Sequence, residues 1–534
     1  MAMAEAHLES VFNKENYPVV DHYTYVLGGD GCMMEGISSE AFSLAGTLGL
    51  SKLIVLYDSN RISIEGSTDI AFRENVQERM QAFGFQTITV EDGNDIDAIG
   101  KAIEAAKADT EHPSFITIKT QIGFGCPAKQ GKASAHGEPL GVENVEALRK
   151  NLNWPSEEPF FVPEEVYKNY SEIAEQKAEV EAAWNVMFAA YCEEYPEMEA
   201  LWNQYHNAKA GEALKDDAGF WAKQEKPEAS RAISGRLINY IKDVLPNLFG
   251  GSADLAPSNK TNMKDAGDFS KEDRAGRNLH FGVRELAMAA IGNGIMLHGG
   301  LRAYVSTFFV FSDYCKPMAR LSALMGVPLT YVFTHDSIGV GEDGPTHEPI
   351  EQMAALRAMP NFHVFRPCDA TETEAAWYSA VTSEHTPTAL VLTRQNLEPM
   401  AGSSREALKG GYIIDDCEGT PELILIASGS EVALAVHAKE TLAAEGQKVR
   451  VVSMPCMDLF EEQSEEYKES VLPREVRRRV AVEALGSFGW DKYTGLDGKI
   501  IAMERFGASA PAGLLFKKFG FTVEHVVEVA KSLK

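Results

Sequence analysis

The chain has 534 residues, an ordinary globular composition, a formal net charge of −28 and a pI near 4.9. This length allows about three domains, and the negative charge argues against sequence-independent nucleic-acid binding and against adhesion to anionic membranes. Seven cysteines without a Cys-x-x-Cys pair, no apolar run of membrane-spanning length and no basic-then-apolar leader predict a cytoplasmic protein.

A helix is predicted at residues 1–13, where several alanines and Leu8 form an apolar surface. No earlier residue is present to cover this surface. We therefore expect it to form an exposed apolar patch.

A strand, helix and strand unit is predicted next. Its elements are a strand at 23–27, a helix at 40–48 followed by Gly49 as a cap, and a strand at 53–57. Asp30 follows the first strand and Asn60 follows the second. Because a right-handed crossover makes such strands parallel, both residues are expected at one carboxyl edge of the sheet, where open α/β sheets bind ligands.

Asp30 and Asn60 supply a carboxylate and an amide oxygen, which are hard donors suited to Mg²⁺ or Ca²⁺ shared with phosphate oxygens. The flanking Gly29 and Gly31 allow a diphosphate to approach the backbone closely. A Gly-Asp-Gly tripeptide alone is a common turn. The prediction therefore depends on Asn60 at the end of the next strand.

The remainder of the first region contains a short extended segment, two strands, a glycine-rich loop and a helical stretch. These lie at 61–64, 86–90, 114–119, 123–137 and 142–226. The loop carries His136, and composition alone also allows a plain surface connection there. The charge-rich helical stretch is interpreted as a connector between domains.

A second α/β region follows, with polar residues again at the ends of its strands. Its elements are helices at 231–240 and 286–298 and strands at 248–255, 330–336 and 390–394. Phe308, Phe311 and Tyr314 recur every three residues, which places them on one side of a helix and is, alone, typical of a core.

The loop after the strand at 330–336 carries His335, Asp343 and His347 among glycines and a proline. A zinc site is the alternative for these residues. The irregular spacing and the lack of a nearby cysteine argue against it. A third α/β region has strands at 423–427 and 449–452 around a helix at 432–445, and its Gly429-Ser430 turn is either an anion cradle or an ordinary tight turn.

The sequence Gly-Asp-Gly-Cys-Met-Met-Glu-Gly-Ile-Ser at 29–38, followed by Asn60, resembles the transketolases among the thiamine diphosphate enzymes. The resemblance covers essentially the whole chain. It implies an α/β fold of three domains with mainly parallel sheets: a diphosphate-binding domain with the connector at 1–195, a pyrimidine-binding domain at 196–411 and a C-terminal domain at 412–534.

The same resemblance implies the cofactors thiamine diphosphate and Mg²⁺ or Ca²⁺, with the metal held by Asp30, Asn60 and the carbonyl of Ile62. Glu285 matches the glutamate that favours the imino tautomer of the cofactor and thereby promotes removal of its C2 proton. An exposed ion pair on the helix is the alternative for Glu285. The remaining cofactor contacts implied are Gly29, Gly31, Glu35, His136 and the aromatic pocket Phe308, Phe311 and Tyr314.

The substrates implied by the resemblance are sugar phosphates, and His136 matches a histidine near the diphosphate and the substrate. Phosphate contacts match Arg231, Ser258, His335 and Arg394, whose charges supply a local cationic site. The other substrate contacts implied are Asp254, Asp343 and His347.

The implied activity moves a two-carbon ketol unit from a ketose phosphate to an aldose phosphate in the pentose phosphate pathway. The family forms homodimers whose active sites lie at the subunit interface, and Glu35 matches a residue at the dimer contact. A solvated glutamate at a helix start is the alternative for Glu35.

The chain departs from the family pattern in the glycine-rich loop and at its N-terminus. Gly125-Cys126 and Gly131-Lys132-Ala133 stand where the family usually has Gly-Ser and Gly-Thr-His. The family's N-terminal segment, with its histidines and Gly-Pro-Leu-Gly-Gln-Gly loop, does not occur. We therefore expect an incomplete first domain, whose missing segment is either supplied by a separate N-terminal chain or lost by truncation. The alternatives are an inactive remnant, one chain of a split enzyme, or a related ketol transferase such as dihydroxyacetone synthase.

Overall fold

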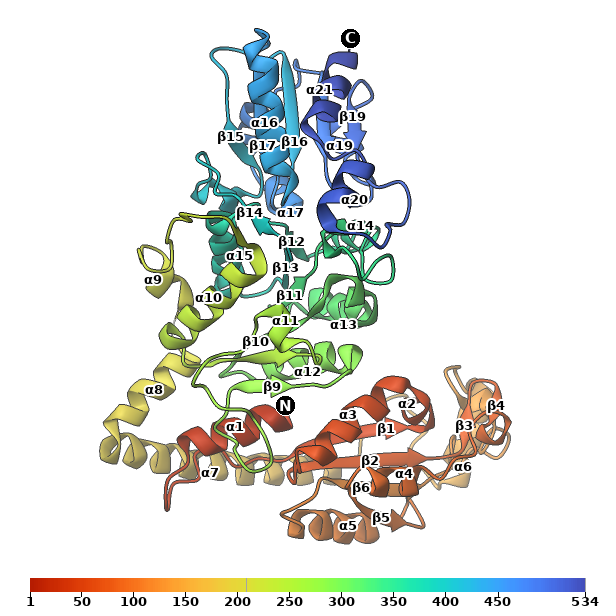
Figure 1. Cartoon of the computed structure of the whole chain (residues 1–534). Helices are drawn as coiled ribbons and strands as arrows, with labels where there is room; N and C mark the ends of the chain where they lie inside the picture. The colour runs from red at the N-terminus through yellow and green to blue at the C-terminus, as the bar shows by residue number, and fades with distance from the viewer. Residues whose placement is uncertain (208, 534) are drawn as a thin grey trace. The chain divides into compact units, whose positions relative to one another are not determined.

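The computed structural model describes residues 1–207 and 209–533 (Figure 1). The chain forms two compact units, one made of residues 1–202 and 270–275 and the other of residues 203–269 and 276–534. Each unit is built on mainly parallel sheets with helices, which confirms the predicted α/β fold. Within the described residues, no helix has the length and apolar character needed to cross a membrane.

The first unit contains a four-stranded parallel sheet in the order β1-β2-β6-β5. Its strands are β1 (Thr24–Gly29), β2 (Leu53–Ser59), β5 (Gln86–Val90) and β6 (Ser114–Lys119). The helices that connect them are α2 (Asp30–Met34), α3 (Gly36–Thr47), α4 (Val76–Ala82) and α5 (Ile96–Ala108). Gly49 adopts a positive φ of 56° directly after α3, which ends the helix as predicted and leads the chain into β2.

The opening helix, α1 (Ala2–Phe12), is present, but the predicted exposed apolar patch is wrong. Leu8 is 1% exposed and Phe12 is fully buried. The ring of Phe12 lies 5.0 Å from that of Trp202, and the hydroxyl of Tyr191 donates to the Phe12 carbonyl at 2.7 Å. The predicted connector therefore covers α1 with its helices α7 (Glu164–Glu194) and α8 (Pro196–His206).

The second unit contains a six-stranded parallel sheet in the order β12-β13-β11-β10-β8-β9. Its strands are β8 (Leu248–Ser252), β9 (Asn278–His280), β10 (Arg302–Phe308), β11 (Thr330–Thr334), β12 (His363–Phe365) and β13 (Thr388–Leu392). The central strands β11 and β13 are completely buried, because helices pack on the sheet. These helices include α10 (Ser230–Val244), α12 (Glu285–His298), α13 (Ser312–Met325) and α15 (Ala370–Thr382).

The second unit also contains a five-stranded sheet in the order β15-β17-β16-β18-β19. Its strands are β15 (Tyr412–Asp415), β16 (Leu423–Ala427), β17 (Val449–Ser453), β18 (Arg479–Val482) and β19 (Lys499–Ile501). β15 pairs antiparallel with β17 and the other pairs are parallel. The main helices of this part are α16 (Glu431–Ala444) and α21 (Val523–Ser532). The domain boundaries at 195 and 411 stay a prediction.

Candidate active site

Asp30 and Asn60 lie at the carboxyl edge of the first sheet. Asp30 begins α2 immediately after β1, and Asn60 follows β2, whose Asp58 is paired in register with Gly29. Asp30 is 4% exposed and lines a cavity of about 340 Å³ together with Ser59, which precedes Asn60. A Cβ atom added at Gly29 would meet nothing within 4 Å, so open space adjoins Asp30.

The hydrogen bonds of Asp30 and Asn60 orient their oxygen atoms. The Tyr57 hydroxyl donates to Oδ1 of Asp30 at 2.5 Å, and the Arg61 backbone N–H donates to Oδ2 at 2.8 Å. Oδ1 of Asn60 accepts the Ile62 N–H at 3.0 Å. Burial and then the bond to Asp30 raise the pKa of Tyr57, which keeps this residue a donor.

This donor set fits a hard cation. Each oxygen of Asp30 and Asn60 retains a lone pair after accepting one hydrogen bond, and the Ile62 carbonyl offers a further oxygen. Carboxylate, amide and carbonyl oxygens are the ligands that Mg²⁺ and Ca²⁺ prefer. These three residues are therefore suited to hold the metal that the sequence predicted.

The two other predicted contacts of this unit are exposed. His136 follows the short 3₁₀ helix at Ala133–Ala135 in the glycine-rich loop, and its backbone N–H donates to Ala133 at 2.8 Å. Glu35 lies between α2 and α3 with an exposed side chain. Its predicted role at a dimer contact stays a prediction.

The aromatic residues Phe308, Phe311 and Tyr314 do not share one helical side, so that prediction is wrong. Phe308 ends β10, Phe311 ends a 3₁₀ turn and Tyr314 lies in α13, because the run before Phe308 pairs as a strand with β11. Their rings nevertheless form a row. Phe308 and Phe311 stack with centroids 6.1 Å apart and planes 7° apart, and Tyr314 lies 5.9 Å from Phe311.

His335 follows β11 and adjoins this aromatic row. Its ring centroid lies 3.8 Å from that of Phe308, and the residue is 3% exposed. Arg231 Nη1 lies 3.4 Å from His335 Nε2, and His335 Nδ1 lies 2.8 Å from Oγ1 of Thr334, which itself donates to Asn259. Since a guanidinium group only donates, these contacts place the proton of the neutral ring on Nδ1.

The same surroundings keep His335 neutral. Burial, and then the positive charges of Arg231 and Arg394, lower its pKa to about 3. A neutral ring accepts at Nε2, on the side where Arg231 lies. This arrangement suits a residue that directs hydrogen bonds without adding charge.

His347 and Glu348 belong to the loop that follows His335. The ring of His347 lies 5.5 Å from Phe311 in an edge-to-face arrangement, and its Nδ1 atom lies 2.9 Å from the Thr346 hydroxyl. Glu348 is 2% exposed, and its carboxylate accepts no side-chain hydrogen bond among the described residues. Burial raises its pKa to about 7.

The predicted phosphate residues lie on the same side of the second sheet as His335. Arg231, in the first turn of α10, donates to the Ser258 carbonyl at 2.8 Å. Burial and then the charge of Arg394 lower the pKa of Arg231, so the two guanidinium groups act on one another. Asp254 is exposed, with a left-handed φ of 60°.

Asp343 and Glu285 are the two remaining predicted residues of the second unit. Asp343 is exposed in the loop between His335 and His347. Glu285 is half-buried at the start of α12, and its carbonyl accepts from the Cys315 thiol of α13 at 3.5 Å. The structure therefore brings Arg231, Ser258 and His335 together, and groups His335 and His347 with the aromatic row.

Sequence reasoning missed the residues that support these side chains. Tyr57 orients Asp30, and Thr334 with Asn259 fixes the tautomer of His335. Tyr57 and Thr334 both lie near the end of a buried strand. A polar residue at such a position indicates a hydrogen-bond partner nearby, because buried polar groups are normally bonded. Asn259 is reached only through the fold, because it lies 75 residues before Thr334.

Comparisons with known proteins cover the whole chain. The family model described as transketolase, thiamine diphosphate binding domain, matches residues 1–210. The transketolase pyrimidine binding domain matches residues 226–400, and the transketolase-like C-terminal domain matches residues 410–522.

Among curated relatives, the transketolase of Bacillus subtilis is 52% identical over 541 residues, covering 100% of this chain and 81% of the relative. The transketolase of Halalkalibacterium halodurans is 51% identical and is covered to 80%. Among solved structures, transketolase from Leishmania mexicana has a TM-score of 0.95 at 45% identity, covering 100% of this chain and 79% of that one. The chain belongs to the transketolase family of thiamine diphosphate enzymes.

Proposed function

We propose that this chain transfers a two-carbon ketol unit from a ketose phosphate to an aldose phosphate, as a transketolase of the pentose phosphate pathway. The observation that carries the proposal is the buried, neutral His335, which lies between the Phe308 ring and the Arg231 guanidinium group. An aromatic surface for a ring and a cationic site for a phosphate thus adjoin one histidine.

The first unit holds the metal and diphosphate in this proposal. Asp30, Asn60 and the Ile62 carbonyl bind Mg²⁺ or Ca²⁺, and the open space beside Gly29 and Gly31 receives the diphosphate. When bound, thiamine diphosphate supplies the acidic thiazolium carbon that carries the ketol unit. His136 and Glu35 are further cofactor contacts in this proposal.

The second unit orients the pyrimidine ring and the substrate. Glu285 bonds to the pyrimidine nitrogen, and Phe308, Phe311 and Tyr314 pack against the ring. The aromatic row supports this role, because its first two rings are nearly parallel.

The substrate contacts divide into a phosphate group and a hydroxyl group. Arg231, Ser258, His335 and Arg394 bind the phosphate, and the mutual effect of the two arginine charges supports this placement. Transketolase from Pichia stipitis was solved as a complex with sedoheptulose-7-phosphate, which supports a ketose phosphate here. The sugar hydroxyl and carbonyl contacts in this proposal are Asp254, Asp343, His347 and His136.

The assembly proposed is a homodimer in which each cofactor contacts the first domain of one subunit and the second domain of its partner. Location in the cytoplasm stays a prediction from the cysteine pattern. A separate N-terminal chain also stays a prediction. Among the described residues, β1 is an edge strand of its sheet, so its free backbone edge gives a further strand a place to pair.

Glu285→Ala tests the catalytic proposal. In the cofactor-loaded assembly, the variant is expected to lose the exchange of the cofactor C2 proton with deuterated water, because no carboxyl group then favours the imino tautomer. NMR of the bound cofactor measures this exchange, and calorimetry checks that diphosphate binding persists.

Glu164→Ala is the matched control, since Glu164 also begins a helix and is exposed. This control should exchange at the wild-type rate. Normal exchange in the Glu285 variant would remove Glu285 from the mechanism.

A further inference from the structure

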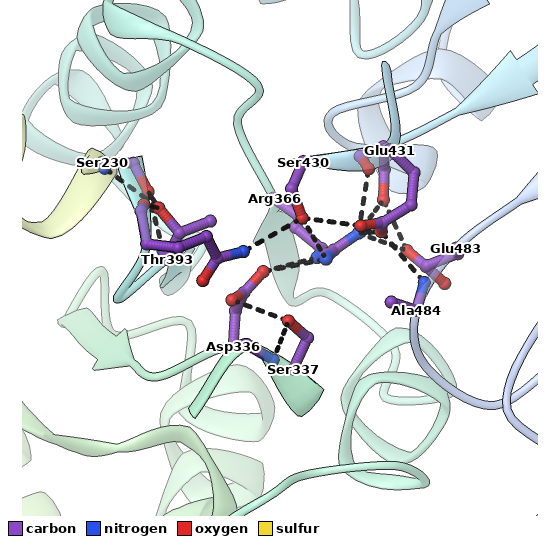
Figure 2. Close-up of polar contacts among 12 residues, drawn as sticks. Ser230, Asp336, Ser337, Arg366, Thr393, Ser430, Glu431, Glu483 and Ala484 are labelled. Carbon is purple, nitrogen blue, oxygen red and sulfur yellow. Dashed lines mark hydrogen bonds and ion pairs between the residues drawn. The ribbon is translucent and has the colours of Figure 1, made fainter. Parts of the chain in front are cut away.

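Side chains from the carboxyl ends of two sheets meet around Arg366, which follows β12 and has no exposed surface (Figure 2). Its Nε and Nη2 atoms lie 3.0 and 2.8 Å from Oδ2 of Asp336, near the end of β11. Its Nη1 atom donates to Glu431 of α16 at 2.5 Å and to the carbonyl of Ser428, after β16, at 2.8 Å. The guanidinium group therefore ties a loop of the six-stranded sheet to two segments of the five-stranded sheet.

Glu483, which follows β18, extends this buried group. The Ser428 hydroxyl donates to it at 2.5 Å and the Trp490 indole at 2.8 Å, while Arg357 donates to both of its oxygens at 2.8 Å. Burial by itself raises a carboxyl pKa, but the charges of Arg357 and Arg366 lower the pKa of Glu483 to about 2. The residue is therefore ionised at neutral pH.

The Gly429-Ser430 turn of the five-stranded sheet packs on the same guanidinium group. A Cβ atom added at Gly429 would lie 2.7 Å from Cζ of Arg366, and the Gly429 N–H donates to the Arg366 carbonyl at 3.0 Å. Its positive φ of 55° also favours glycine. The Gly429-Ser430 turn, for which the sequence allowed either an anion cradle or an ordinary tight turn, thus contacts Arg366.

Asp336 links Arg366 to the substrate side, because His335 is its chain neighbour. His335 has a left-handed φ of 64°, a conformation that a non-glycine residue keeps only where its surroundings hold it. The two bonds from Arg366 to Asp336 provide such a restraint at the next residue.

A second series of hydrogen bonds leads from Arg366 to Ser230 and Thr393, the chain neighbours of the two predicted phosphate arginines. Ser230 and Thr393 exchange backbone-to-hydroxyl bonds of 3.1 and 2.7 Å (Figure 2). The Thr393 hydroxyl donates to the Gln395 carbonyl at 2.8 Å, and the Gln395 amide donates to Ser430 at 3.3 Å. Ser430 in turn accepts from Arg366 at 3.4 Å.

We propose that Arg366 is a positioning residue for substrate phosphate, and that the five-stranded sheet sets phosphate affinity through Glu431 and Arg366. Of the four residues placed on the phosphate, all but Ser258 are chain neighbours of a buried residue of this group: Arg231 of Ser230, His335 of Asp336 and Arg394 of Thr393. The inference rests on the proposed function. Arg366 itself touches no substrate and acts through Asp336 and Ser430.

Arg366→Lys tests the proposal, because lysine keeps the charge, but its single nitrogen cannot reproduce the bonds that Nε, Nη1 and Nη2 make to Asp336, Glu431 and Ser430. Calorimetry on the cofactor-loaded protein compares ribose 5-phosphate with ribose, neither of which reacts without a donor. The variant is expected to weaken ribose 5-phosphate binding about five- to fiftyfold and ribose binding less than about twofold, since a displaced group loses part of its hydrogen bonding to the charged phosphate.

Arg357→Lys is the matched control. Arg357 is also a buried arginine bonded to Glu483, but it has no bond to Asp336. Both variants should lower the melting temperature, whereas Arg357→Lys should retain the wild-type preference for the phosphorylated sugar. A merely structural role for Arg366 would give the two variants the same sugar preference.

Glu431→Gln tests the positioning role of Arg366 if Arg366→Lys does not fold. It removes the carboxylate that contacts Arg366 most closely and should weaken ribose 5-phosphate binding in the same direction. Arg394→Ala separates the two proposals. If Arg394→Ala loses the phosphate preference while the Arg366 and Glu431 variants keep it, the positioning role is overturned and the proposed function stands. If the wild type has no phosphate preference that depends on Arg394, both the positioning role of Arg366 and the proposed function are contradicted.

Discussion

Arg394 is the most exposed of the predicted phosphate residues, and its charge acts on both Arg231 and His335. Arg394→Ala should raise KM for phosphorylated aldoses far more than for unphosphorylated hydroxyaldehydes. A lost hydrogen bond to a charged group costs about 1.5–3 kcal/mol, or roughly tenfold to over a hundredfold. Steady-state kinetics with both substrate types measures the difference.

Arg477→Ala serves as the control for Arg394, because Arg477 is an exposed arginine of the five-stranded sheet region that pairs with Asp497. It should change neither KM. Equal effects of Arg394→Ala on both substrate types would place the phosphate elsewhere.

Glu348 links the site loop to pH-dependent stability. Burial raises its pKa from 4.5 to about 7, so folding favours the protonated form. That contribution is complete below pH 4.5 and is lost as the pH rises through 7. Glutamine cannot ionise, so the free energy of unfolding of Glu348→Gln should exceed that of the wild type by up to about 3 kcal/mol at pH 8. At pH 4.5 the two proteins should differ little.

Thermal unfolding between pH 4.5 and pH 8 measures the effect of Glu348→Gln. Glu342→Gln is the control, since Glu342 belongs to the same loop but is exposed. A gain that is the same at every pH would show that ionisation of Glu348 is not its cause.

Among the elements, α1 shows how a helix of mixed pattern acquires a partner from distant sequence. Leu8 is 1% exposed, so Leu8→Ala should lower the free energy of unfolding by about 2–5 kcal/mol. Leu27→Ala, in the exposed edge strand β1, should change it by less than about 0.5 kcal/mol. Urea titration compares the two, and equal losses would mean that α1 is not packed as described.

The strands were the most predictable elements. Continuous apolar runs such as those of β2, β11 and β16 are typical of parallel strands buried on both faces, and all three are present. The aromatic row was mispredicted because a three-residue spacing is compatible with a helix, while pairing with β11 keeps Phe308 in a strand. Tertiary pairing decided between two locally acceptable conformations.

At the scale of the whole molecule, the predicted site residues divide between the two units. Asp30 belongs to the first and Glu285 to the second. If each cofactor contacts two subunits, a dimer of one Asp30→Ala subunit and one Glu285→Ala subunit retains one intact site. Random mixing of the two inactive variants should then restore about a quarter of the wild-type activity.

This mixing experiment is measured as ketol transfer in the assembly that carries the activity, after subunit exchange. Mixing Asp30→Ala with Asn60→Ala is the control, since both changes affect the same half of the site and should restore nothing. No recovery in the first mixture would show that each site is built within one subunit.

The sequence by itself determined the α/β class, the strands and the polar residues at their carboxyl ends, because hydrophobic periodicity and turn residues are local properties of the chain. Asp30, Asn60 and His335 were found in this way. Only the tertiary structure decided what covers α1, which tautomer His335 adopts and how Arg366 joins two sheets. Arg366, which follows β12 of one sheet, and Glu431, which begins a helix packed on the other, are 65 residues apart, and Tyr191 reaches Phe12 across 179 residues. No local pattern encodes such pairs, since their energy arises only when packing removes both partners from water.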